Sequence, residues 1–291
     1  MRLSVFIWFG AVLGAGGCEN KDPELILFTK PTGVTMNSYS GNLMEPFITR
    51  DGKYLLFNNL NNPAENTNLH WATRKDDYTF TYQGEITGVN TADIEGTPSM
   101  DKSGNLYFIS TRDYANLLST IYSCTFTNGN ATNVALVQGI SRKEAGIVNF
   151  DVEINNNGDS MYFVDGQYDS GGKLQAADIV MASKTAAGFE RAANSSEILK
   201  NVNTDQLEYA ASISTDDLEL FFTRVAAPLS EASVPQIFYA KRKTTDSAFD
   251  VPVQLTGLGD FVEAPSISNN GRALYYHRMV NDKFVIYEVR R

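Results

Sequence analysis

Cysteine, histidine and tryptophan are scarce in this 291-residue chain, which contains two of each. Two histidines and two cysteines are too few for a His/Cys zinc site, and neither an H-E-x-x-H nor a C-x-x-C motif occurs. Basic residues are also in deficit: 24 of them face 34 acidic residues, for a net charge of −10. This charge has the wrong sign for neutralising phosphates. The composition therefore argues against zinc chemistry and against a nucleic-acid partner.

Long hydrophobic runs are missing, apart from one at the N-terminus. Residues 3–13 follow Arg2, are mostly apolar and lead through small residues to Cys18. The run is too short to span a bilayer, which takes about 20 residues, but it has the length of a signal peptide. The residues before Cys18 resemble the lipobox of bacterial lipoproteins. This resemblance implies cleavage before Cys18 and lipidation of its thiol; an ordinary secretory signal with an incidental cysteine is the alternative.

The expected organisation follows from this start. Residues 1–17 are a signal peptide of lipoprotein type, residues 18–24 a lipid-anchored tether, and residues 25–291 a single domain. We expect the mature protein in the cell envelope, attached to the membrane through its lipid anchor only, on the periplasmic side or at the cell surface.

One sequence unit recurs five times along the chain. Each copy has a short apolar strand that an acidic residue opens, a turn of Asp-Gly or Asn-Gly type, and a second strand that ends in aromatic residues. The copies are about 55 residues apart, as expected of a repeat array. The last aromatic residues of the five units are Phe57, Phe108, Phe163, Phe222 and Tyr276.

A third and a more polar fourth strand follow in most units, and four antiparallel strands per unit are typical of a propeller blade. The sequence therefore predicts an all-β fold, a five-bladed β-propeller. The fifth unit ends after its third strand, whereas residues 25–29 form a strand-like run outside any unit. We expect the N-terminal strand to complete the last blade, because an open sheet edge promotes aggregation.

Residues 88–99 with 104–112, and residues 201–204 with Glu208, resemble the WD40-like repeats of TolB-type propellers. The likeness covers residues 40–291 and implies the propeller fold of secreted bacterial proteins; the repeat occurs in partner-binding periplasmic proteins, in outer-membrane-associated proteins and in peptidases. As partner we expect a protein or an envelope polysaccharide. Peptidases with this repeat carry an additional α/β-hydrolase domain, for which the 291 residues leave no room.

The acidic residues that open the units are the main candidate site. They are Glu45, Glu95, either Asp151 or Glu153, Glu208 and Glu263. Since inner strands line a propeller channel, equivalent positions are expected to form a ring of carboxylates near one mouth of it. Such a ring could bind calcium, could supply the acid and base of glycoside hydrolysis, or could brace the blades by accepting hydrogen bonds.

Two further sets of residues complete the candidates. Arg112, Arg224 and Arg278 follow the second strand of three blades and could bind carboxylates of a ligand at the rim, or form ion pairs between blades. His70 and His277 lie in different blades, and without a G-x-S-x-G elbow they indicate no nucleophilic triad. We interpret them as hydrogen-bonded strand residues.

Because no asymmetric catalytic cluster is visible, we assign no catalytic residue and no cofactor other than a possible calcium ion. The sequence favours a binding or scaffolding propeller over an enzyme; the alternative is a carbohydrate-active hydrolase that uses the channel carboxylates. A funnel in which an acidic residue outside the repeat meets two ring carboxylates would favour the hydrolase. A channel filled by aromatic side chains would favour the scaffold.

Overall fold

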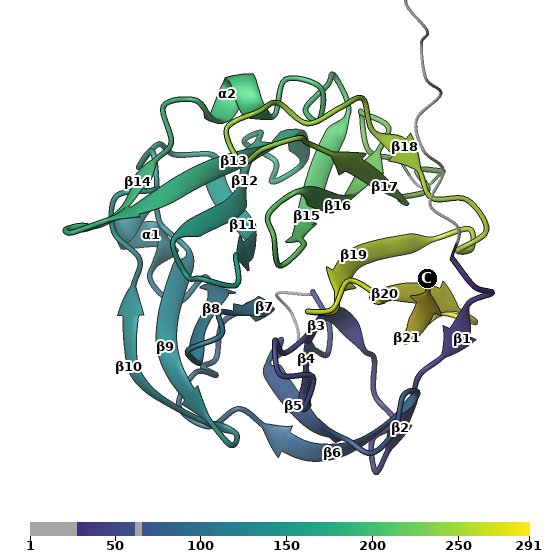
Figure 1. Ribbon diagram of the computed structural model, residues 1–291. Coiled ribbons are helices and arrows are strands. Elements are labelled where there is room, and N and C mark those ends of the chain that lie inside the picture. The colour runs from purple at the N-terminus through teal and green to yellow at the C-terminus, as the bar shows by residue number, and fades with distance from the viewer. Residues whose placement is uncertain (1–27, 62–65, 231) are drawn as a thin grey trace, which may run out of the picture.

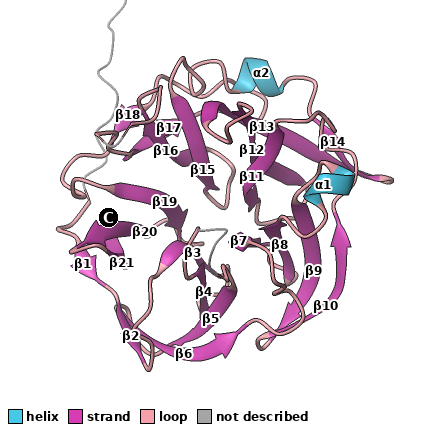
Figure 2. Cartoon of the chain, turned by 180° about the vertical axis from the view of Figure 1, so that it is seen from behind, coloured by secondary structure: helices cyan, strands magenta, loops and turns pink. Residues whose placement is uncertain are grey.

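The structure, a computed structural model, describes residues 28–61, 66–230 and 232–291. Nearly all of its regular secondary structure is β-strand, and the mostly antiparallel strands group into blades around a central channel, two of which the parallel bridge between Ala177 and Leu207 joins into one eight-stranded sheet (Figure 1). The first strand of each group lies nearest the channel, and the view from behind shows the same arrangement (Figure 2). The fold is the predicted all-β propeller.

The blades are numbered in chain order, and the strands of each blade follow one another from the channel outward. Blade 1 contains β3 (Met44–Ile48), β4 (Tyr54–Asn58), β5 (Leu69–Arg74) and β6 (Thr79–Glu85), with the short parallel β2 (Thr35–Asn37) outside β6. Blade 2 contains β7 (Glu95–Met100), β8 (Asn105–Ser110), β9 (Ile121–Thr127) and β10 (Asn130–Leu136). Blade 3 contains β11 (Ile147–Ile154), β12 (Ser160–Tyr168), β13 (Leu174–Thr185) and β14 (Gly188–Arg191). Blade 4 contains β15 (Leu207–Ile213), β16 (Glu219–Val225), β17 (Gln236–Lys241) and β18 (Val253–Gln254). Blade 5 contains β19 (Val262–Ile267), β20 (Ala273–Val280), β21 (Lys283–Arg290) and β1 (Thr32–Gly33).

The N-terminal segment completes blade 5, as predicted. Strand β1 pairs antiparallel with β21, and the Thr29 and Val34 N–H groups donate to the carbonyls of Arg290 (2.7 Å) and Ile286 (2.9 Å). The strand lies a few residues after the predicted run 25–29, of which residues 25–27 are outside the described part of the chain. The predicted signal peptide, the tether and Cys18 also lie outside it.

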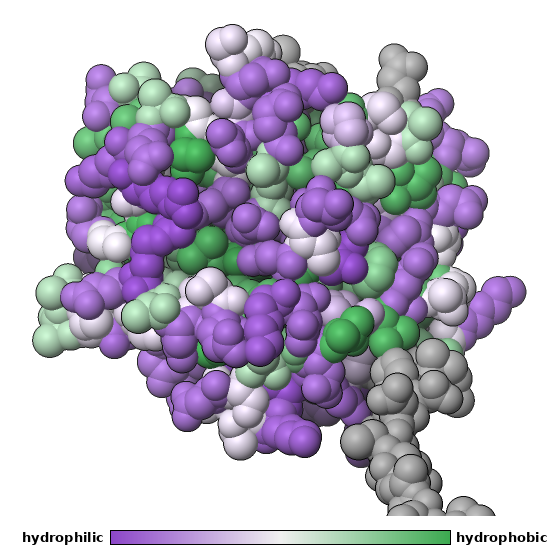
Figure 3. All heavy atoms as spheres, turned by 90° about the horizontal axis from the view of Figure 1, so that it is seen from above, coloured by the Kyte–Doolittle hydropathy of each residue, from purple (hydrophilic) through white to green (hydrophobic). Residues whose placement is uncertain are grey.

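Two one-turn helices, α1 (Tyr114–Leu117) and α2 (Ser195–Ile198), lie at the rim of the disc (Figure 2). Within the described residues, no helix is long and apolar enough to cross a membrane. The face seen in Figure 3 is mostly hydrophilic, and its hydrophobic residues are scattered. The apolar side chains pack instead between neighbouring blades, where five core clusters form.

Every inner strand contains a β-bulge at the same place. The pairing register with the second strand shifts there in all five blades. The bulged residue has a φ near +50° in each case, and these residues are Glu45, Thr97, Asp151, Ala210 and Ala264. The next residue is proline in blades 1, 2 and 5, a residue that bulges tolerate because it has no N–H for the ladder. The bulge therefore decides which residues of each inner strand face the channel.

Side chains two positions beyond the bulge join neighbouring blades. In four blades they accept the N–H of the following blade's inner strand, over distances from 3.0 to 3.2 Å. The acceptors are Ser99, Glu153, Ser212 and Ser266. Phe47 occupies this position in blade 1 and has no polar atom for the task. These contacts hold the inner strands at fixed positions around the channel.

Candidate functional site

A cavity of about 380 Å³ opens at the end of the channel where the second strands of the blades terminate. Most of the cavity wall is apolar and includes Ile94, Phe150, Leu174 and Leu229. The rest of its lining is polar, and no lysine or arginine is among the described residues that line it. Below them the channel narrows to a space of about 30 Å³. The channel is therefore a funnel that narrows below the cavity and carries acidic groups at its neck.

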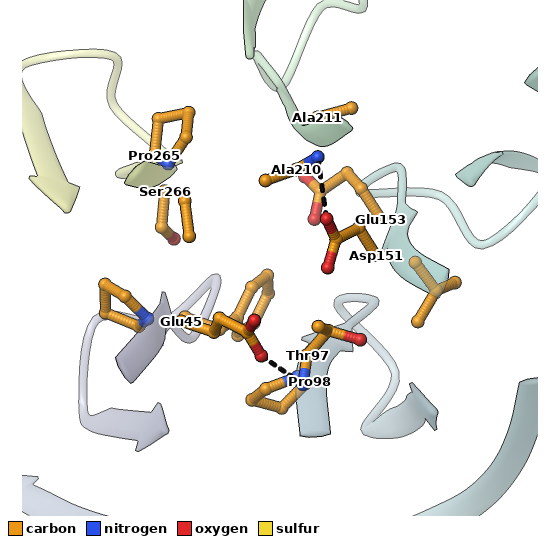
Figure 4. A pocket seen from close by; sticks show the side chains of 13 residues that line it. Glu45, Thr97, Pro98, Asp151, Glu153, Ala210, Ala211, Pro265 and Ser266 are labelled. Carbon is orange, nitrogen blue, oxygen red and sulfur yellow. Dashed lines mark hydrogen bonds between the residues drawn. The ribbon is translucent and has the colours of Figure 1, made fainter. Parts of the chain in front are cut away.

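Glu45 and Asp151 occupy the bulge position of blades 1 and 3 and point into the funnel from different sides (Figure 4). The Glu45 carboxylate accepts the N–H of Thr97 at 3.1 Å and the side-chain amide of Asn61 at 2.5 Å. Asp151 accepts the N–H of Ala210 at 3.1 Å through one oxygen. Each carboxylate thus holds the bulge of a neighbouring blade and still faces the cavity.

Glu263 is the third acidic residue of the cavity and lies one position before the bulge of blade 5. The Tyr209 hydroxyl donates to one of its oxygens, and His277 Nε2 lies 3.0 Å from the other. The Glu45 N–H donates to His277 Nδ1 at 3.0 Å. Because Nδ1 accepts this bond, Nε2 carries the proton that is donated to Glu263. His277 therefore connects the backbone of Glu45 to the carboxylate of Glu263. We refer to Glu45, Asp151 and Glu263 as the channel carboxylates.

The channel carboxylates influence one another electrostatically. Burial raises the pKa of Asp151 well above its usual range, and the nearby carboxylates of Glu45 and Glu263 raise it further. Burial also raises the pKa of Glu45, against the opposing effect of the hydrogen bond from Asn61. The pKa of the Tyr209 hydroxyl is raised as well, mainly by burial and then by the charge of Glu263. A carboxyl group that keeps its proton at higher pH than usual is suited to act as a general acid.

Glu95 and Glu208 lie at a different register position, two residues before the bulge, and are fully buried within their blades. Glu95 accepts the N–H and hydroxyl of Thr91, at 2.7 and 2.8 Å, and pairs with Arg112 at 3.3 Å. Glu208 accepts the same two groups of Thr204, at 3.1 and 2.6 Å, and pairs with Arg224 at 2.7 Å. These two bracing carboxylates do not line the cavity.

Glu153 lies two residues beyond the bulge of blade 3, in the narrow part of the channel. It forms a buried ion pair with Arg50 at 3.0 Å and accepts the Ser99 hydroxyl at 2.6 Å. Of the two acidic residues that the sequence offered in blade 3, Asp151 faces the cavity, and Glu153 closes the channel beneath it. The six candidate acidic residues thus occupy four different register positions relative to the bulge, and they do not form one ring.

The predicted arginine and histidine candidates lie in different environments. Arg112 and Arg224 are held in the ion pairs of blades 2 and 4, whereas Arg278 forms no ion pair with a described residue and stacks on Tyr287. His70 is 5% exposed, stacks on Phe57 and lies 3.0 Å from the Tyr82 hydroxyl. Burial lowers the pKa of His70 to about 4.

The sequence repeats do not single out Tyr209 or Asn61, and they indicate only a strand position for His277. A signal for separating the acidic residues is nevertheless present. The two bracing carboxylates each follow an Asn-Thr pair by four residues, in residues 90–95 and 203–208, whereas none of the channel carboxylates does. Within the described residues, no group of three or more metal-ligating side chains is arranged to hold a metal ion.

No protein-family model matches the chain, and no curated protein matches it in sequence. Solved structures do resemble it. A thermostable family-43 glycoside hydrolase is 12% identical, with a TM-score of 0.53 over 88% of this chain and 92% of its own. The catalytic domain of the GH62 alpha-L-arabinofuranosidase of Coprinopsis cinerea is 10% identical, with a TM-score of 0.55 over 90% of this chain and 96% of its own. A putative TolB from Agrobacterium tumefaciens is 12% identical, with a TM-score of 0.52 over 88% of this chain and 77% of its own.

At these identities the likenesses concern the fold alone. They agree with the β-propeller that the repeats predicted and with a TolB-like arrangement of its blades. They do not single out TolB, since glycoside hydrolases match the chain equally well. The chain is a β-propeller protein whose channel ends in a cavity with three carboxylates.

Proposed function

We propose that the protein is a glycoside hydrolase whose reaction takes place at the channel carboxylates. The observation that carries this proposal is the convergence of Glu45, Asp151 and Glu263 at the neck of the funnel. Glu263 stands outside the register position that Glu45 and Asp151 share, so the site breaks the symmetry of the repeat. The cavity volume is in the range of small-molecule sites. The glycoside hydrolases among the similar structures support the same class of activity.

Asp151 is the proposed general acid. Its raised pKa keeps it protonated at a pH where an ordinary carboxyl group has ionised. One of its oxygens accepts the N–H of Ala210, and no other described residue donates to the carboxyl group. The acid proton is therefore available to the oxygen of a leaving group in the cavity.

Glu263 is the proposed general base. The Tyr209 hydroxyl and His277 Nε2 hold one oxygen each and fix the orientation of the carboxylate. Each oxygen keeps a further lone pair that can accept a proton from water. Glu45 is a positioning residue: its N–H orients His277, and its charge contributes to the raised pKa of Asp151. In this arrangement Asp151 protonates the departing sugar while Glu263 activates the attacking water.

Hydrolysis of a panel of nitrophenyl glycosides and oligosaccharides tests the proposal, and α-L-arabinofuranosides are the first substrates to try because a similar structure is an alpha-L-arabinofuranosidase. We expect Asp151→Asn and Glu263→Gln to lower kcat at least about 100-fold. A substrate with a good leaving group should partly rescue Asp151→Asn, which would identify the acid.

Glu208→Gln is the matched control, because Glu208 is an inner-strand carboxylate that does not line the cavity. At a temperature where this variant is folded, it should hydrolyse the substrates at the parent's rate. Absence of turnover across the panel, combined with measurable binding of an oligosaccharide, would overturn the hydrolase and leave the binding module.

We also propose that the protein is a lipoprotein of the cell envelope, on the basis of the residues that precede Cys18. Replacement of Cys18 by alanine should move the protein from the membrane fraction to the soluble one and abolish labelling by a fatty-acid analogue. Unchanged membrane association would refute the lipid anchor.

A further inference from the structure

Arg278 shares its register position with Arg224, and Arg112 reaches the same kind of ring from two residues further along, since Ser110 holds that register position in blade 2. All three lie over an aromatic ring of the third strand: Arg112 over Tyr122 at 4.9 Å, Arg224 over Phe238 at 4.6 Å, and Arg278 over Tyr287 at 4.6 Å. In blades 2 and 4 the guanidinium group is neutralised by a bracing carboxylate. In blade 5 the equivalent inner-strand residue, which pairs with Arg278 across the sheet, is Val262.

The loss of the partner extends to the loop before the inner strand. Residues 87–91 of blade 2 read Thr-Gly-Val-Asn-Thr, and residues 256–260 of blade 5 read Thr-Gly-Leu-Gly-Asp. Blade 5 therefore lacks the Asn-Thr pair as well as the glutamate. Gly259 stands in the place of the asparagine, and a Cβ atom there would lie only 2.5 Å from Arg278 Nε. The guanidinium group is held between the backbone of Gly259 and the ring of Tyr287.

Arg278 has no hydrogen-bond or ion-pair partner among the described residues. Its Nε is buried without a partner, whereas its two terminal nitrogens are not among the buried atoms. An arginine that is fixed by packing and has free terminal donors is suited to bind a carboxylate in bidentate geometry. We propose that Arg278 binds a carboxylate from outside the chain, in place of the glutamate that blades 2 and 4 supply themselves.

The position of Arg278 indicates the source of this carboxylate. Arg278 follows His277, which lines the cavity, but successive side chains of a strand point to opposite faces, so the guanidinium group lies outside the cavity wall and Arg278 is not among the lining residues. The cavity has three carboxylates and, among the described residues that line it, no lysine or arginine, so an acidic sugar would be repelled from it. The ligand is therefore an acidic polysaccharide that places a neutral sugar in the cavity and a uronate against Arg278. The choice of a polysaccharide rests on the proposed function.

Binding measurements by calorimetry, with tetragalacturonate as the probe and its methyl ester as the neutral counterpart, test the inference. The parent should bind the acid at least about 10-fold more tightly than the ester, and Arg278→Gln should lose this preference. Arg278→Lys keeps the positive charge but lacks the planar guanidinium group, so it should retain only part of the preference for the acid. Arg272→Gln is the matched control, because Arg272 is an exposed arginine next to the other end of β20 and should bind as the parent does.

Val262→Glu provides a second, independent variant. It restores the carboxylate that blades 2 and 4 have at this position and should occupy Arg278 from within the chain. We expect it to abolish the preference for tetragalacturonate without lowering the melting temperature. Parent-like preference in Arg278→Gln or Val262→Glu, an equal loss in Arg272→Gln, or a parent that binds neither probe would overturn the inference.

A hexaglutamate peptide and inorganic phosphate serve as competing anions. If either binds through Arg278 as tightly as tetragalacturonate does, the assignment to a polysaccharide is wrong. These measurements need no turnover, so they separate the two proposals. The hydrolase proposal is wrong if no glycoside is cleaved. The proposed Arg278 site is wrong if its variants bind the probes as the parent does.

Discussion

The bracing carboxylates and the channel carboxylates begin from the same sequence feature and end in different environments. Glu95 and Glu208 are fully buried, and each accepts the hydroxyl and the N–H of a threonine four residues earlier and pairs with an arginine. The channel carboxylates lie at the cavity, where none of the described lining residues is a lysine or an arginine. Buried charges without a counter-ion are costly, and a fold keeps them where they serve binding or chemistry.

The difference is one of register on a bulged strand. The bracing pair lies two residues before the bulge, whereas Glu45 and Asp151 lie at it and Glu263 lies just before it. A shift of one residue moves a side chain to the other face of a strand, and a bulge adds such a shift locally. The position relative to the bulge therefore separates a carboxylate that is buried within its blade from one that faces the cavity.

The largest expected effect is the loss of stability when a bracing carboxylate is replaced. Glu208→Gln removes the charge that neutralises Arg224, which is 9% exposed, and should lower the free energy of unfolding by about 3 kcal/mol. Glu263→Gln leaves no arginine unpaired, so it should change the free energy of unfolding by less than about 1 kcal/mol. Urea unfolding of the two variants measures the contrast, and equal losses would abolish the distinction between the two classes.

A smaller effect with a defined pH dependence is expected at Asp151. Its folded pKa lies above its unfolded pKa, so the folded state binds more protons and stability falls as pH rises from the unfolded pKa through the folded one. Asp151→Asn removes the titrating group and should flatten this fall. The variant should match the parent at acidic pH and be the more stable protein at neutral pH. Thermal melts from pH 4 to pH 8 test this, and parallel curves would show that Asp151 does not contribute.

Much of the fold could be predicted because every repeat contains the local sequence signals for its strands and its turn. The hairpin turn illustrates this: glycine at positions 52, 104, 158 and 271 adopts a positive φ, and Asp217, where glycine was expected, takes the same conformation with a φ of 60°. The short polar side chain of aspartate tolerates it. N-terminal closure was also predictable, since a fifth unit without a fourth strand requires one from elsewhere.

The site was less predictable because its geometry depends on the bulge. Counting from the repeat put Glu95, Glu208 and Glu263 at one level, whereas the bulge puts only Glu263 at the cavity. His277 could not be assigned from its strand alone, because its two partners come from blades 1 and 5, which are more than 200 residues apart in the chain at Glu45 and Glu263. Contacts between the first and last blades exist only once the ring has closed.

The smallest expected effect is that of calcium. The channel carboxylates accept hydrogen bonds from Asn61, Thr97, Ala210, Tyr209 and His277, so most of their oxygens are already engaged. A calcium ion takes six to eight oxygen ligands, and no group of side chains in the described part of the chain is arranged to hold a metal. Melting temperatures measured in calcium and in chelator should therefore agree. A rise with calcium that Asp151→Asn removes would mean that the three carboxylates converge on a cation, and the acid and base roles of Asp151 and Glu263 would have to be withdrawn.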